Sequence, residues 1–76
     1  MTGMMWVDTD SQKDLATKVI EAAAHYYKKY GVEAALCQVN PAAVDGDPHI
    51  VIAGIHVEAA PWILPHHYFM VAEESA

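Results

Sequence analysis

A helical repeat of apolar residues over residues 11–30 limits the folds open to this chain more than any other feature. The repeat forms two neighbouring rows: Leu15, Val19, Ala22, Tyr26 and Tyr30, with Ala16, Ile20, Ala23 and Tyr27. This spacing places both rows on one side of an α-helix. Polar residues such as Lys18, Glu21 and His25 occupy the other side. A helix of about 30 Å must therefore bury its apolar stripe against a second layer.

Signals at both ends of this repeat set the bounds of the helix. Ser11 and Asp14 resemble a capping box, and Asp10 is a competing N-cap. Two lysines lie in the last turn, where the helix dipole favours cations. Gly31 fits the residue after the C-terminus, where positive φ suits glycine. The sequence predicts a helix over residues 11–30.

Alternating patterns predict strands on both sides of this helix. The three clearest are residues 34–39, 49–58 and 66–72. Both faces of the 34–39 segment are mostly apolar, which indicates a central strand. The N-terminal segment 1–10 includes a possible short strand at 4–7, and residues 73–76 are expected to fray.

The 49–58 segment leaves one alternative open. Gly54 divides it, so it is either a single strand with a glycine bulge or a tight hairpin at Ala53-Gly54. The apolar residues keep one parity through Gly54, from Val51 to Val57. This continuity favours a single bent strand.

These elements predict a single domain over residues 1–76 of the α+β class. One long amphipathic helix packs on a small, mainly antiparallel sheet of three to four strands, in the order (β)-α-β-β-β. The face of the predicted sheet that the helix does not cover is too apolar to be in contact with water alone. We expect Cys37, Val39 and the set of Val51 and Val57 on that face or in the core.

Composition points to association with protein. The chain has 76 residues, of which 54% are hydrophobic and 18% charged. So small and apolar a domain is expected to keep apolar surface after folding, so that it binds a protein partner or itself as a homo-oligomer.

The net charge of −6, with no arginine, argues against nucleic acid as a partner. All of this net charge falls in residues 31–76. An acidic inhibitor or nucleic-acid mimic that occupies a basic site is therefore the second hypothesis.

The location expected for the chain is the cytoplasm. Cys37 is a single cysteine, which fits a reducing compartment. The first seven residues lack the positive start of a signal peptide, and no apolar run approaches the roughly 20 residues that span a bilayer. We therefore predict no membrane partner.

Little in the sequence indicates catalysis, and we predict neither an enzyme nor a cofactor. Cys37 lies in an apolar strand, where a thiol is usually inert. His56 and Glu58 share one strand face and are weak metal candidates, because zinc needs three or four ligands. His66 and His67 point to opposite faces of a strand. A small metal or ligand binder is the third hypothesis.

The segment Pro61-Trp62-Ile63-Leu64-Pro65 is the strongest candidate for a partner-binding site. Two prolines hold three large apolar side chains in an extended form, and tryptophan is enriched at binding hot spots. The alternative is a crossover that packs over the core. The excess of apolar residues favours contact with a partner by Trp62, Ile63 and Leu64, together with Trp6 and Phe69.

A series of short motifs follows the helix. They are the strand end Val39-Asn40-Pro41, the strand Ile52-Ala53-Gly54-Ile55-His56-Val57, the step Leu64-Pro65 and the closing run Phe69-Met70-Val71. Their order over residues 18–72 resembles the axial domain of HK97-type phage capsid proteins and encapsulin shells. The long spine helix, the E-loop and the peripheral domain of that family are missing. The resemblance implies a standalone module that contacts or caps such shells, and it transfers no catalytic residue.

Overall fold

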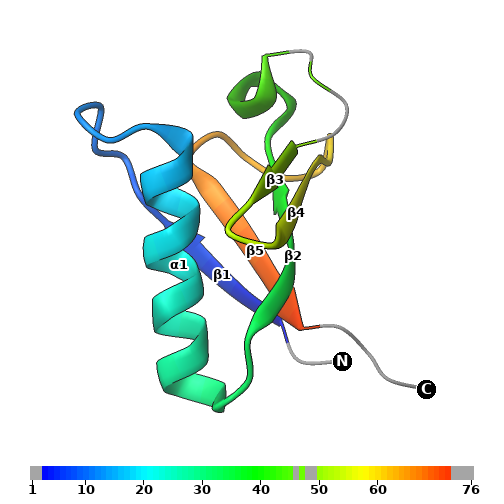
Figure 1. Ribbon diagram of the computed structural model, residues 1–76. Coiled ribbons are helices and arrows are strands. Elements are labelled where there is room, and N and C mark those ends of the chain that lie inside the picture. Colours follow the sequence, from blue (N-terminus) through cyan, green and yellow to red (C-terminus); the bar gives the residue numbers. More distant parts are fainter. Residues whose placement is uncertain (1–2, 46, 48–49, 73–76) are drawn as a thin grey trace.

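One helix and five strands form two layers in the computed structural model, which describes residues 3–45, 47 and 50–72 (Figure 1). Along the chain these elements are β1 (Gly3–Val7), α1 (Leu15–Tyr30), β2 (Ala34–Val39), the short 3-10 helix η1 (Pro41–Val44), β3 (Ile50–Ile52), β4 (Ile55–Ala59) and β5 (His67–Ala72). The α+β class is confirmed. The predicted tail at 73–76 and the predicted strand residue His49 lie outside the described residues.

The sheet has the strand order β1-β5-β2-β4-β3. It has more strands than the three to four predicted. It is also mixed, because β2 and β4 run parallel while the other pairs are antiparallel. The parallel pair arises because β3 and β4 form a hairpin after the chain turns at η1. β2 is central, as its two apolar faces predicted.

The single bent strand expected over 49–58 is wrong, because the chain turns back at Ala53-Gly54. The φ angles of Ala53 and Gly54 are 51° and 80°. Positive φ at both central residues is the property of a type I′ hairpin turn. Ile52 and Ile55 pair across this turn. The constant parity of the apolar residues did not indicate a single strand. A two-residue turn places the odd-numbered residues before it and those after it on opposite faces of the sheet.

The helix begins later than predicted and ends where expected. Asp14 is the N-cap, with its carboxylate accepting a hydrogen bond from the Thr17 N–H at 2.8 Å. The proposed caps at Ser11 and Asp10 are wrong, since both residues precede this turn. Gly31 has a φ of 74° and donates to the Tyr27 carbonyl at 2.7 Å.

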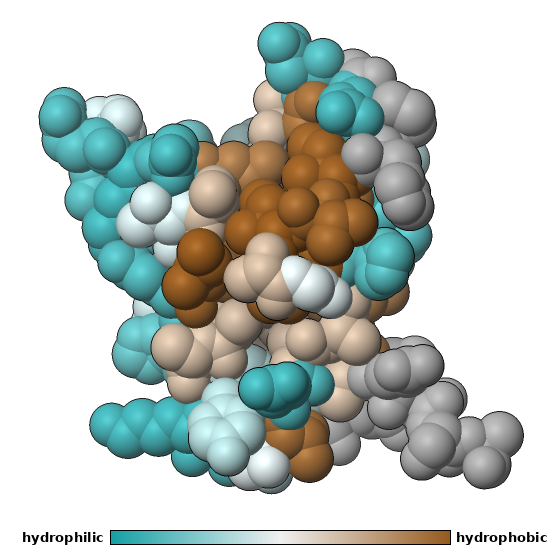
Figure 2. Space-filling model, in the orientation of Figure 1, coloured by the Kyte–Doolittle hydropathy of each residue, from teal (hydrophilic) through white to brown (hydrophobic). Residues whose placement is uncertain are grey.

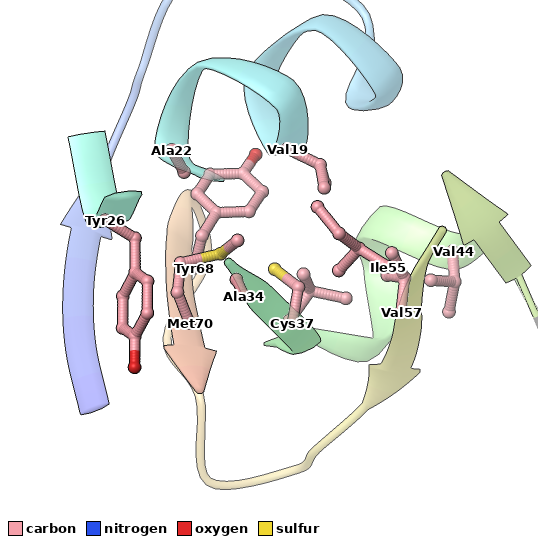
Figure 3. Close-up of a cluster of buried hydrophobic side chains, with 11 residues drawn as sticks. Val19, Ala22, Tyr26, Ala34, Cys37, Val44, Ile55, Val57, Tyr68 and Met70 are labelled. Atoms are coloured by element: carbon pink, nitrogen blue, oxygen red, sulfur yellow. The ribbon is translucent and has the colours of Figure 1, made fainter. Parts of the chain in front are cut away.

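The core lies between α1 and the sheet (Figure 3). Val19, Ala22 and Tyr26 of the helix stripe have no exposed surface. They meet sheet residues that all point to the helix side, including Cys37, Val39, Val57, Tyr68 and Met70. The Tyr26 hydroxyl accepts a hydrogen bond from the Ala72 N–H at 3.1 Å.

The buried stripe of α1 is narrower than the sequence pattern indicated. Ile20 and Tyr27 are 49% and 55% exposed. One helix is about 10 Å wide and five strands span about 20 Å, so the helix leaves part of its side of the sheet uncovered. Figure 2 shows the resulting apolar surface over the β3–β4 hairpin, beside α1. A groove of ≈ 370 Å³ lies there, lined in part by Ile20, Tyr27, Ala53 and Ile55.

The segment between β4 and β5 crosses the end of β2. The Ala60 N–H donates to the Val39 carbonyl at 2.8 Å, and Asn40 Nδ2 donates to the Ile63 carbonyl at 2.9 Å. Ile63 is only 1% exposed. This segment therefore anchors the exposed residues on either side of Ile63.

Among the described residues, no helix is long and apolar enough to cross a membrane.

Candidate interaction surface

The face of the sheet turned away from α1 carries no helix or strand of the described chain. Side chains alternate between the two faces of a strand, so the neighbours of the core residues point here. We call this surface the open face. It consists of Gly3, Met5, Val7, Leu36, Gln38, Val51, His56, Glu58, His67, Phe69 and Val71.

Much of the open face is apolar. Met5, Val7 and Val51 are 46%, 53% and 52% exposed. Among the described residues, the only carboxylate on it is that of Glu58, whose Oε1 accepts a hydrogen bond from Gln38 Nε2 at 2.9 Å. The surface is therefore nearly uncharged on a chain whose net charge is −6.

An aromatic pair stands on the open face. The rings of Trp62 and Phe69 meet edge to face, with centroids 5.9 Å apart. Trp62 remains 61% exposed. The Phe69 ring lies over Gly3, where a Cβ would approach the ring to 2.3 Å, so glycine gives the ring its space. The aromatic pair adds a raised apolar side to an otherwise flat sheet.

The structure brings together only some of the residues predicted to bind a partner. Trp62 and Phe69 are in contact, and Leu64 is 64% exposed in the same crossing segment. Ile63 is buried. Trp6 points to the helix side, where its ring stacks on His25 at 4.2 Å.

Sequence reasoning did not assign the flat part of the open face to partner binding. Met5, Val7 and Leu36 were not named as candidates, although their strand parity separates them from Met4, Trp6 and Cys37. That parity becomes informative once it is known which face the helix covers.

The weak metal candidates, His56 and Glu58, share the open face as their spacing predicted. Glu58 already holds the Gln38 amide. Among the described residues, no three histidine, cysteine, aspartate or glutamate side chains are grouped as a metal ion requires. His67 Nδ1 donates to the Pro65 carbonyl at 2.8 Å, and His66 is exposed on the neighbouring turn.

Cys37 is enclosed between the sheet and α1 with no exposed surface. Burial raises the pKa of its thiol to about 12. A thiol in this state is a poor nucleophile, because the thiolate is the reactive form.

Comparisons with protein-family models, with curated proteins and with solved structures found no match.

Proposed function

We propose that this chain is a self-associating protein-interaction domain, and that two copies bind through their open faces. The observation that carries the proposal is the combination of exposed apolar side chains with almost no charge on one whole face of the sheet. Monomeric domains rarely leave an apolar surface of this extent uncovered. Trp62 and Phe69 supply the kind of aromatic anchor on which protein interfaces depend.

Charge favours a second copy as the occupant of this face. Each copy carries a net charge of −6, which opposes association wherever the acids meet. In the part of the chain that the structure describes, the open face holds one carboxylate, that of Glu58, and it is hydrogen-bonded to Gln38. Two copies that meet through this face would keep the other acidic residues of the described chain apart. A strongly basic partner would find few charges there to bind.

The size of the face also suits a pair. Five strands about 4.8 Å apart, each of roughly five residues at about 3.3 Å, cover a plane of about 400 Å². Two such faces with their side chains would bury roughly 1,000 Å² in total, which is close to the lower limit of about 1,000 Å² for a specific interface. Packed about 10 Å apart, the two sheets would form a sandwich with a helix on each outer side.

The test is the mass of the protein in solution, measured by light scattering on a sizing column at two salt concentrations. We expect a dimer whose mass does not fall when salt is added, because salt screens the repulsion between the acidic copies. The variant Met5→Lys places a charge on the open face and should give a monomer. The double variant Trp62→Ala, Leu64→Ala should weaken association while the protein stays folded.

Ile20→Lys is the matched control. Ile20 and Met5 are equally exposed, at 49% and 46%, but Ile20 lies on the helix side. It should leave the dimer intact. A monomeric wild type, a dimer that survives Met5→Lys, or a dimer that is lost in Ile20→Lys would each overturn the proposal. A mass that falls steeply with added salt would also contradict it, since that result indicates association through charges.

A further inference from the structure

One border of the sheet is formed by β1, and among the described residues its only partner strand is β5. The Asp8 N–H donates to the His66 carbonyl at 3.1 Å, directly after β1. Hydrogen-bonded pairs alternate with non-hydrogen-bonded pairs along an antiparallel ladder. Every second residue back from Asp8 therefore bonds to β5, and the residues between them direct their N–H and C=O groups outward. The outward set is Gly3, Met5 and Val7.

The border of β1 lacks the features by which proteins protect a strand edge. Proline, charged side chains, bulges and short length normally keep another strand from pairing. β1 contains no proline and no charged residue, and its register with β5 is regular over five residues. The opposite border, β3, has three residues, and only Val51 of these directs its backbone groups outward. β1 is thus the better template for an added strand.

The two sides of a strand added to β1 would meet different surroundings. On the open face, its side chains would lie beside the half-exposed apolar side chains of Met5 and Val7. On the other side they would lie beside α1, where the His25 ring stacks on the Trp6 ring at 4.2 Å. An incoming segment therefore needs apolar residues at every second position and polar residues between them.

The C-terminal end of β1 lies beside an acidic part of the chain. Lys13 bridges Asp8, which follows β1, and Glu21 of α1, at 3.5 and 2.7 Å. Residues 8–21 hold four acidic residues and two lysines, a net charge of −2. The end of an added strand that lies here is best matched by a basic residue.

The last turn of α1 has the opposite charge. Lys28 and Lys29 follow His25 by three and four residues, so they lie one turn further along the same side of the helix. α1 and β1 run in opposite directions (Figure 1), so this turn lies toward the start of β1. An antiparallel strand on β1 would begin beside the acidic residues and finish beside these two lysines.

We propose that the border of β1 binds an extended segment of a partner protein as a sixth, antiparallel strand. The segment has a basic residue at its start, an acidic residue near its end and apolar residues at alternate positions. An antiparallel pair is slightly more stable per residue than a parallel one. The hydrogen bonds would lie in the plane of the sheet, so packing of two open faces leaves this border accessible. The inference goes beyond the proposed self-association and does not rest on it.

The probe is the peptide acetyl-Lys-Val-Thr-Val-Glu-Val-amide, titrated into the ¹⁵N-labelled full chain and followed by amide chemical shifts. Its three valines would oppose Val7, Met5 and Gly3 in turn, with its lysine beside Asp8. Peptide at millimolar concentration should shift the amides of β1. The peptide with lysine and glutamate exchanged has the same composition and should bind several-fold more weakly.

N-methylated forms of the probe test the strand pairing itself. The N–H of the middle valine would donate to the Met5 carbonyl, so methylation of this nitrogen should weaken binding at least about 10-fold. The N–H of the threonine would point away from β1, so methylation there should change binding less than about twofold. The reverse result indicates a parallel strand, because the bonding residues then have the opposite parity, and it would overturn the antiparallel arrangement.

Two proline variants test the border of β1 on the protein. Met5→Pro removes an outward N–H without breaking a hydrogen bond to β5, so the chain should fold and lose peptide binding. Val51→Pro makes the same change on β3, at a residue of similar exposure on the same open face, and should bind like the wild type. If Met5→Pro does not fold, the two N-methylated peptides decide the question on the wild-type chain.

Four results would each overturn the proposal: no shift of the β1 amides, shifts confined to β3, equal binding of the two N-methylated peptides, or binding that survives Met5→Pro. The peptide acetyl-Gly-Met-Met-Trp-Val-amide, which has the sequence of β1, tests the second copy as the occupant. Tighter binding of this peptide than of the probe would overturn the charged partner segment in favour of pairing between two copies.

Discussion

Residues with a positive φ angle lie in turns and at the ends of elements, where this chain changes direction. Asp45, Ala53 and His66 are the non-glycine residues with this geometry in the described part of the chain. A side chain with a Cβ is strained there by about 1–2 kcal/mol. Asp45 ends η1, Ala53 forms half of the β3–β4 turn, and His66 directly precedes β5. The strain at Ala53 gives a direct test of the hairpin.

Ala53→Asn should stabilise the protein by about 0.5–1 kcal/mol, because Asn-Gly is the preferred pair of a type I′ turn. Gly54→Ala should destabilise it by about 1–2 kcal/mol. A Cβ on Gly54 meets nothing within 4 Å, so this loss comes from the backbone alone. Urea unfolding at one protein concentration measures both variants. A loss of stability in Ala53→Asn would contradict the turn.

The buried thiol of Cys37 makes a second prediction at this scale. With its pKa raised to about 12, little thiolate forms at mildly alkaline pH. Labelling of the folded protein by a disulfide reagent should be at least about 100-fold slower than labelling of the chain in guanidinium. Equal rates under the two conditions would show that the thiol is exposed.

At the scale of the elements, helix α1 depends on one carboxylate at its start. Asp14 caps the helix, and the hydrogen bond from the Thr17 N–H lowers the pKa of this carboxyl below its usual value of 3.8. A lowered pKa in the folded state adds stability above pH 3.8, and this stability is lost as the pH falls through the folded pKa.

Asp14→Ala should therefore be less stable than the wild type near neutral pH, and the difference should shrink below pH 3.8. Asp14→Asn is the matched control, since it keeps a capping side chain without a titratable group. Thermal melts across the acidic range measure all three proteins. A difference between Asp14→Ala and the wild type that does not change with pH would contradict the assigned cap.

The sequence predicted those features of the structure that depend on residues close together along the chain. The stripe of α1, the role of Gly31 and the central place of β2 follow from spacing and composition within short segments. The strand order could not be read in this way, because β5 inserts between β1 and β2 from the far end of the chain. Burial of Lys18 likewise depends on two segments far away along the chain, within 40–43 and 65–68, which lie beside a position that helical spacing assigns to water.

The same contrast applies to the candidate sites. Trp62 and Phe69 could be named because large aromatics stand out in any sequence. The flat apolar part of the open face could not, because Met5, Val7 and Val51 look like core residues until the position of the helix is known. The resemblance of residues 18–72 to the axial domain of capsid shells stays a prediction.

At the scale of the whole molecule, small size and self-association are linked. A domain of 76 residues buries only about 60% of the surface of its unfolded chain, so the proposed contact with a second copy would supply a large share of its stability. The melting temperature of the wild type should therefore rise with protein concentration. Met5→Lys should melt at one temperature at all concentrations. Calorimetry over a hundredfold range of protein concentration measures this dependence. A wild-type melting temperature that does not change with protein concentration would contradict the proposed dimer.

The position of β5 has a consequence for how the protein is made. It is the last of the five strands to leave the ribosome, yet it lies between β1, the first, and β2. At 5–20 residues per second, β1 waits about 3–13 s for its only neighbour in the sheet. During this interval the apolar Met4, Met5 and Trp6 have no strand beside them. The nascent chain should therefore be a client of ribosome-associated chaperones until β5 has left the ribosome.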